Sequence, residues 1–228
     1  MPITTCVFDA YGTLFDVTAA ARHAADQPGQ DQLANLWPKL AADWRSKQLQ
    51  YSWLRAVTGE HVSFWQVTMD ALDWAMEASN IDDPILRETL LALYWELPAY
   101  SEAPKTLALL KAAGFKTAIL SNGSPDMLDG AVDFSGTREW LDDVVSVESV
   151  GIFKPARVVY DMVQAHLDTP PENVLFVSAN GWDAAAAAAY GFQTAWINRA
   201  ADPVDRLPGK PAHILSDLAG IPDLAGAL

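Results

Sequence analysis

Residues 4–13 of the 228-residue chain read TTCVFDAYGT and contain the first strand of the fold. Residues 4–8 are apolar or β-branched, which predicts a short buried strand, and this strand stops at the charged side chain of Asp9. Gly12 follows as a turn signal. The chain therefore begins with a buried strand whose carboxyl end carries a carboxylate.

Beyond residue 100 the sequence alternates between helix and strand patterns. Gly114 and Gly191 each end a helix pattern, and Pro125 follows a capping Ser124 at the start of another. We predict strands over residues 115–120, 144–147, 174–177 and 194–197, and helices over residues 104–113, 155–167 and 183–190. Such alternation produces a parallel sheet covered by helices on both faces. The predicted fold class is α/β, with a doubly wound parallel sheet.

Residues 18–96 interrupt this alternation with a different pattern. They contain no β-branched runs, and their apolar side chains recur at the spacing of a helix. One stripe contains Trp37, Leu40, Trp44, Tyr51 and Leu54, and a second contains Trp65, Met69, Leu72 and Met76. We therefore expect a core domain formed by residues 1–17 and 97–228, with residues 18–96 inserted as a helical cap subdomain.

The composition excludes several kinds of partner. Asp and Glu number 29 against 15 Lys and Arg, so the formal net charge is −14, which repels phosphate backbones and anionic membrane surfaces. Cys6 is the single cysteine and the four histidines are scattered, so neither a disulfide nor a zinc cluster is expected. No run approaches the ~18 apolar residues that span a bilayer. We expect a cytoplasmic protein that binds neither nucleic acid nor membrane.

Polar side chains follow the predicted strands at their carboxyl ends, where open parallel sheets bind their ligands. These side chains are Asp9, Ser121, Asn122, Ser178, Asn180 and Asp183, and a loop brings Lys154 to the same edge. Individually each has a structural explanation, since Asp183 could cap a helix and Lys154 could be solvated. Turn chemistry does not require a carboxylate matched by a lysine, so the set as a whole indicates a functional site.

Four segments of the chain resemble the four motifs of the haloacid dehalogenase superfamily. They are VFDAYGTLFDV at residues 7–17, LSNGSPDML at 120–128, FKP at 153–155 and FVSANGWDA at 176–184. They are most similar to the L-2-haloacid dehalogenase branch, and WRSKQLQYSWL at residues 44–54 resembles the arginine-bearing cap helix of that branch. The resemblance covers the whole chain and implies a Rossmann-like core with an inserted helical cap.

Tyr11 distinguishes this chain from the phosphatases of the superfamily. Those enzymes carry a D-x-D-G-T motif, in which the second aspartate protonates the leaving alcohol and helps to hold Mg²⁺ through its carbonyl. The corresponding residues here are Asp9, Ala10, Tyr11, Gly12 and Thr13, so the second acid is missing. Mg²⁺ needs several hard oxygen ligands, and phosphoryl transfer depends on such a metal. We therefore expect neither a metal ion nor another cofactor.

The resemblance implies a hydrolase that converts short (S)-2-haloalkanoic acids into (R)-2-hydroxy acids and halide. Asp9 would displace the halide and form an ester, which water would cleave at the Asp9 carbonyl. Asp183 is the candidate base for that water, and Asn180 would fix the water in place. Lys154 would keep Asp9 ionised and separate the two carboxylates. The remaining catalytic candidates, which would orient these groups, are Thr13, Tyr160 and Ser178.

Contacts to the organic acid follow from the same resemblance. Ser121 and the backbone N–H groups of Ala10 and Tyr11 would hold the substrate carboxylate. A small apolar pocket that excludes water would be lined by Leu49, Trp53, Phe64 and Tyr11. For Trp53 and Phe64, packing within the cap is an equal alternative.

The leaving halide would be received by Arg45, Asn122 and the indole of Trp182, as in the family. Because Arg45 belongs to the helical segment, closure of the cap on the core would complete the site. The alternative is that Arg45 is a surface residue of an amphipathic helix.

Two other functions and one question of assembly stay open. Asp9 could attack phosphorus in a metal-dependent phosphatase or phosphonate hydrolase of the same superfamily, or the chain could be a catalytically silent binding protein that keeps the fold. A homodimer is possible, because an interface would explain the tryptophans of the helical segment, although burial under the cap would explain them equally. These residues include Trp37, Trp65, Trp74 and Trp95.

Overall fold

The computed structural model describes residues 2–29 and 31–228. Within this part of the chain, six parallel strands form one sheet in the order β3-β2-β1-β4-β5-β6. The strands are β1 (Thr5–Phe8), β2 (Lys116–Ser121), β3 (Asp143–Ser146), β4 (Val174–Ser178), β5 (Gln193–Ile197) and β6 (His213–Leu215). The predicted α/β class is confirmed. β6 has no counterpart among the predicted strands, because it is short and none of its three residues is buried.

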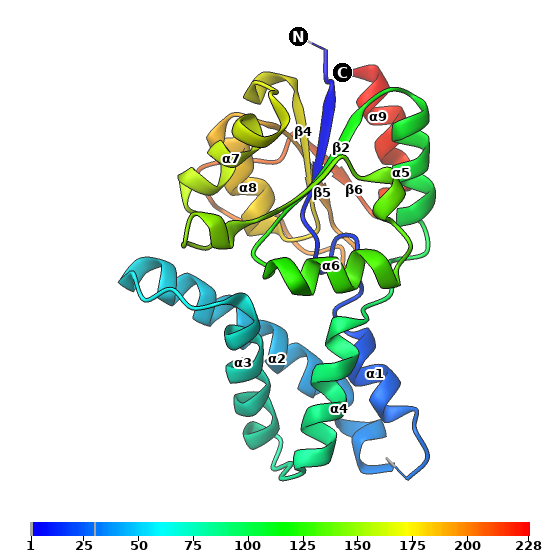
Figure 1. Ribbon diagram of the computed structural model, residues 1–228, viewed down its shortest axis with the longest axis vertical. Helices are drawn as coiled ribbons and strands as arrows, with labels where there is room; N and C mark the ends of the chain where they lie inside the picture. Colours follow the sequence, from blue (N-terminus) through cyan, green and yellow to red (C-terminus); the bar gives the residue numbers. More distant parts are fainter. Residues whose placement is uncertain (1, 30) are drawn as a thin grey trace.

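Helices pack on both faces of this sheet (Figure 1). α5 (Ala103–Ala112) and α9 (Ile221–Ala227) lie together on one face, and α7 (Arg157–Leu167) and α8 (Gly181–Tyr190) lie together on the other. α6 (Pro125–Phe134) connects β2 to β3. Short 3₁₀ helices occupy Arg138–Trp140, Val147–Ser149, Pro171–Asn173 and Leu218–Gly220. Since both faces are covered, β1 and β4 are buried along their whole length.

The chain between β1 and α5 forms a block of helices beyond the carboxyl end of β1 (Figure 1). Its described helices are α1 (Ala19–Ala25), α2 (Asp31–Thr58), α3 (Phe64–Ala78) and α4 (Pro84–Trp95). Side-chain caps define where α3 and α4 begin. Ser63 accepts a hydrogen bond from the N–H of Gln66 at the start of α3, and Asp83 accepts two backbone hydrogen bonds at the start of α4. Among the described helices, none is both long and apolar enough to cross a membrane.

The two predicted apolar stripes lie on α2 and α3, and these two helices pack against each other. Leu40 and Trp44 are buried on α2, and Leu72 and Met76 are buried on α3. The stripe was also expected to include Leu54, but that side chain is 54% exposed. The reason is that the last turns of α2 extend away from the other helices (Figure 1).

The register of the sheet determines which polar side chains meet. β1 lies between β2 and β4, with Phe8 opposite Ile119 on one side and Val177 on the other. Asp9 follows directly, and its N–H donates to the carbonyl of Val177 over 2.9 Å. The ends of the three central strands therefore present Asp9, Ser121 and Ser178 at the edge that faces the helical block.

Candidate active site

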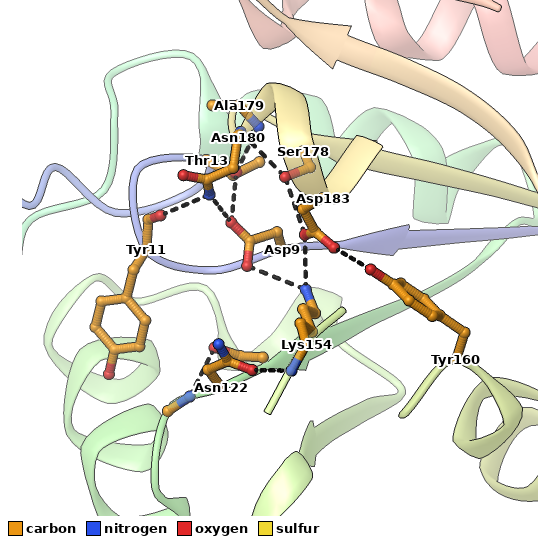
Figure 2. A network of polar contacts seen from close by, with 12 residues as sticks. Asp9, Tyr11, Thr13, Asn122, Lys154, Tyr160, Ser178, Ala179, Asn180 and Asp183 are labelled. Carbon is orange, nitrogen blue, oxygen red and sulfur yellow. Dashed lines mark hydrogen bonds and ion pairs between the residues drawn. The ribbon is translucent and has the colours of Figure 1, made fainter. Parts of the chain in front are cut away.

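Asp9 lies just past the end of β1 and is held by three side chains (Figure 2). The hydroxyl of Thr13 and the amide nitrogen of Asn180 donate to its Oδ2 over 2.9 and 2.8 Å, and Lys154 Nζ donates to its Oδ1 over 3.2 Å. The intervening turn passes through Gly12, whose φ of +88° is a left-handed conformation that glycine adopts without strain. The turn brings Thr13 back onto the carboxylate four residues earlier. Asp9 is thereby fixed in one orientation.

Lys154 lies between two carboxylates and is almost completely buried. Its Nζ contacts Asp9 Oδ1 at 3.2 Å and Asp183 Oδ2 at 2.9 Å, and its backbone N–H donates to Asn122 Oδ1 over 2.9 Å. Burial alone would lower the pKa of Lys154, but the carboxylates of Asp183 and Asp9 outweigh it and raise the pKa above its usual value. The lysine is therefore charged at neutral pH, and a solvated surface position for it is wrong.

Asp183 is fully buried and accepts hydrogen bonds from three side chains. Besides Lys154, Tyr160 donates its hydroxyl proton to Oδ1 over 2.7 Å, and Ser178 donates to Oδ2 over 3.1 Å (Figure 2). Burial raises the pKa of Asp183 even though Lys154 acts to lower it. Asp183 stands in the first turn of α8, whose N-cap is Asn180. The alternative that Asp183 is itself the helix cap is therefore wrong.

Arg45 reaches from the helical block to the core. From α2, its Nη2 donates to the Tyr11 carbonyl over 3.0 Å and to Asn180 Oδ1 over 3.3 Å, while its Nη1 donates to Gln48 Oε1 over 2.7 Å. These contacts exclude the alternative of a surface arginine. They also join α2 to the loops that follow β1 and β4.

A small cavity of about 10 Å³ lies among these groups. Its lining consists of Asp9, Tyr11, Arg45, Leu49, Phe64, Ser121, Asn122, Lys154, Asn180 and Trp182, all of which the sequence singles out. The other candidates, Ala10, Thr13, Tyr160, Ser178 and Asp183, lie behind this lining and are buried. Trp182 Nε1 is buried without a hydrogen-bond partner among the described residues. A residue of the lining therefore carries an unused hydrogen-bond donor.

A larger, open pocket of about 690 Å³ adjoins the small cavity. The two share Arg45, Leu49, Asn180 and Trp182, and the outer wall of the larger pocket includes residues 198–200 and 202–206. Trp53, which we expected in the apolar lining, lies outside the small cavity and packs edge-on against Trp182, with 5.4 Å between the ring centroids. Phe64 does line the cavity, and its ring contacts that of Tyr11.

Three residues near the site escape the sequence analysis. Gln48 and Tyr94 are buried behind Arg45, and Gly123 lies against the ring of Tyr11. Gln48 falls within the same quoted segment as Arg45 and lies one helical turn after it. This spacing places the two side chains next to each other on the helix and could have identified Gln48. Gly123 likewise falls within the quoted segment at residues 120–128. Tyr94 has no comparable signal, because its contacts join segments far apart in the sequence.

Gly123→Ala should destabilise the fold by about 1–3 kcal/mol, the usual cost of overpacking a core. The added Cβ would lie 2.6 Å from Tyr11 Cε2 and 3.0 Å from Leu128 Cδ2, so the Tyr11 ring would have to move against its neighbours. Thermal unfolding measures the loss. Gly226→Ala is the control, because its Cβ meets nothing within 4 Å, and it should not lower stability. Equal melting temperatures for the two variants would contradict the crowding.

Comparisons with known proteins agree with this geometry. The family described as haloacid dehalogenase-like hydrolase matches residues 3–191. The chain is 45% identical to (S)-2-haloacid dehalogenase 1 of Pseudomonas sp. (strain CBS-3) over 98% of this chain and 96% of that protein. It is 38% identical to the (S)-2-haloacid dehalogenase of Pseudomonas sp. (strain YL) over 95% of this chain and 92% of that protein.

Solved structures give the same result. The L-2-haloacid dehalogenase of Xanthobacter autotrophicus, solved with chloropropionic acid covalently bound, superposes with a TM-score of 0.87 and 33% identity over 99% of both chains. A further dehalogenase crystal structure has a TM-score of 0.92 and 37% identity over 97% of this chain and 96% of the other. The chain therefore belongs to the haloacid dehalogenase-like hydrolases and, among them, to the (S)-2-haloacid dehalogenase family.

Proposed function

We propose that this protein hydrolyses short (S)-2-haloalkanoic acids to (R)-2-hydroxy acids and halide, without a cofactor. The observation that carries the proposal is the fixed carboxylate of Asp9, which borders a small cavity beside a buried, charged Lys154. Its relatives in sequence and structure are named as dehalogenases of 2-haloacids, and one of those structures carries chloropropionic acid as a covalent adduct.

In the first step, an oxygen of Asp9 attacks the α-carbon of the haloacid in line with the carbon–halogen bond. A carbon–oxygen bond forms as the halide leaves with the bonding electron pair, so the α-carbon is inverted and Asp9 becomes an ester. Lys154 Nζ lies 3.2 Å from Oδ1 of the attacking group, and the contacts from Thr13 and Asn180 fix its direction. Negative charge develops on the leaving halide, where N–H donors of the protein can stabilise it without a metal ion.

The two charged ends of the substrate need separate partners. For the carboxylate we propose Ser121, which lines the cavity, together with the backbone N–H groups of Ala10 and Tyr11. For the departing halide we propose a cradle of Arg45, Asn122 and Trp182, all in the same lining. The unpartnered indole N–H supports this cradle, because a buried donor without an acceptor costs free energy until an anion meets it. The apolar walls would be Leu49, Phe64 and the ring of Tyr11.

In the second step, water attacks the carbonyl carbon of the Asp9 ester. Asp183 takes one proton of the water, the bond between the Asp9 carbonyl carbon and the alkoxide oxygen breaks, and Asp183 returns that proton to the alkoxide to give the hydroxy acid. The second proton of the water is released to solvent as Asp9 returns to its carboxylate form. The raised pKa of Asp183 suits a base, and the donors Tyr160 and Ser178 hold its carboxylate in place. Asn180, which also contacts Asp9, would position the water.

The oxygen atoms of this site do not fit a hard cation. The Tyr11 carbonyl already accepts hydrogen bonds from Arg45 and Asn180, over 3.0 and 3.4 Å, and Asp9 Oδ2 accepts one from Asn180 over 2.8 Å. Protein N–H groups therefore occupy the directions in which a metal-dependent phosphatase would present oxygen to Mg²⁺. Across residues 2–29 and 31–228, no group of three or more His, Cys, Asp or Glu side chains is arranged to hold a metal ion.

Halide release from L-2-chloropropionate should be unaffected by a chelator. The direct test incubates the protein with L-2-chloropropionate plus EDTA, and separately with p-nitrophenyl phosphate plus Mg²⁺, and measures chloride and phosphate. Chloride release in EDTA supports the dehalogenase. Phosphate release without chloride would show a phosphatase instead, and no release of either would favour a silent binding protein.

The proposal extends to domain organisation, assembly and location. Residues 18–96 would be a cap that closes over residues 1–17 and 97–228, since Arg45 of α2 contacts the core.

A homodimer is supported by the exposed apolar side chains at the end of α2, Trp53, Leu54 and Val57, and by the partly exposed Trp74. Light scattering in solution tests it. The buried free thiol of Cys6 suits the reducing cytoplasm.

A further inference from the structure

Gln48 lies one helical turn after Arg45 on α2 and is buried where three helices of the block meet. Its Oε1 accepts a hydrogen bond from Arg45 Nη1 over 2.7 Å, and its Nε2 donates to Thr68 Oγ1 on α3 over 2.7 Å. Tyr94 on α4 contacts both ends of the same amide, at 3.1 Å from Nε2 and 3.3 Å from Oε1. Both amide atoms of Gln48 are therefore hydrogen-bonded.

The hydroxyl of Thr68 determines which way the amide of Gln48 points. A threonine hydroxyl has one proton to donate, and Thr68 donates it to the carbonyl of Phe64 over 2.8 Å. Toward Gln48, the Thr68 oxygen can then only accept, so the amide nitrogen must face it. The amide oxygen consequently faces Arg45, where an acceptor is needed.

Tyr94 connects this network to the wall of the cavity. Its ring stacks on that of Tyr11, with 5.8 Å between centroids and 15° between planes, and it also packs on Trp44 at 4.8 Å. Trp44 in turn donates its indole N–H to the backbone carbonyl of Thr68 over 2.9 Å. The position of Gln48 is thus set by contacts from α2, α3 and α4 together.

We propose that Gln48 is a positioning residue that aims the guanidinium of Arg45 at the departing halide. This inference rests on the dehalogenase reaction proposed above. Arginine has many rotamers, and a group that stabilises developing charge is effective only when it is held in place beforehand. With Nη1 held by Gln48, Nη2 is directed at Tyr11 and Asn180, beside the cavity. Gln48 itself does not line the cavity.

Gln48→Met tests the proposal, because methionine has a similar length and no hydrogen-bonding amide. We expect kcat for L-2-chloropropionate to fall by about 10- to 100-fold, the range for a misplaced catalytic group, with KM nearly unchanged because other residues hold the carboxylate. The fall should be smaller with L-2-bromopropionate, since bromide leaves more readily and needs less stabilisation. In an Arg45→Ala background, Gln48→Met should cause no further loss of kcat.

Two comparisons separate positioning from a general loosening of the helical block. Ala71→Gly, at a buried position of α3 outside the network, lowers helix stability by about 1 kcal/mol and should keep the wild-type kcat. An equal loss of kcat in Ala71→Gly at matched stability would overturn the proposal, as would an undiminished effect of Gln48→Met in the Arg45→Ala background. Halide release by the wild type tests the reaction itself, so the two failures are distinguishable.

Discussion

Asp9→Asn is expected to reduce chloride release from L-2-chloropropionate by about 10⁴-fold or more, as for loss of a catalytic nucleophile. Asparagine matches the shape of aspartate and can still accept a hydrogen bond from Thr13, but an amide does not displace halide from saturated carbon. Asp126→Asn is the matched control, because Asp126 is exposed in the first turn of α6, and it should keep full activity. A chloride-release assay compares the two variants.

Isotope labelling of the wild type tests the same step independently. In one turnover with excess enzyme in H₂¹⁸O, the label should enter the carboxylate of Asp9, because water attacks the aspartyl carbonyl and the hydroxyl oxygen of the product comes from Asp9. Mass spectrometry of the peptide and of the hydroxy acid locates it. Label found directly in the first-turnover product would contradict an ester intermediate, as would a fully active Asp9→Asn variant.

Lys154→Met is expected to remove activity and to destabilise the protein by about 3–5 kcal/mol, the usual cost of breaking a buried ion pair from one side. The variant would leave Asp9 and Asp183 buried without the cation that lies between them at 3.2 and 2.9 Å. Thermal unfolding and the chloride-release assay measure the two effects. Lys105→Met, at an exposed position of α5, controls for loss of a lysine. It should change neither the stability nor the chloride release.

The stability difference between wild type and Lys154→Met should depend on pH in one direction. The pKa of Lys154 in the folded protein lies above its usual value of 10.5, so its contribution is fully present below that value. It is lost only as the pH rises through the folded-state pKa. The difference should therefore not shrink between pH 7 and pH 9, and it should shrink in stronger alkali. A difference that vanished between pH 7 and pH 9 would contradict the charged, buried lysine.

Most of the sheet was predictable from local sequence, because its strands are buried and apolar and stop at polar residues. The positions of Asp9 and Ser178 at neighbouring strand ends followed from this pattern and from the rule that parallel strands end at one edge. β6 escaped because an edge strand with an exposed Ile214 has no apolar run to detect.

The parts of the site that depend on packing between distant segments were less accessible. The identity of Arg45 and Trp182 as cavity residues came from family resemblance, since helical spacing alone allowed a surface position for Arg45. Leu54 was expected to be buried because the same spacing does not show that the last turns of α2 extend beyond the other helices of the block. Gln48 went unnoticed because its partners on α3 and α4 are 20 and 46 residues away in sequence.

The contacts of Arg45 imply reciprocal coupling between two equilibria of the proposed enzyme. One guanidinium both docks α2 on the core and borders the cavity, and that cavity, at about 10 Å³, has room for roughly one water molecule. A haloacid is larger than one water molecule, so the cavity would have to widen to admit it, and release of the docked guanidinium would widen it. If docking of α2 on the core strengthens halide binding by some factor, bound halide strengthens the docking of α2 by the same factor. Accumulated chloride would consequently slow release of the hydroxy acid, giving product inhibition whose strength depends on this one side chain.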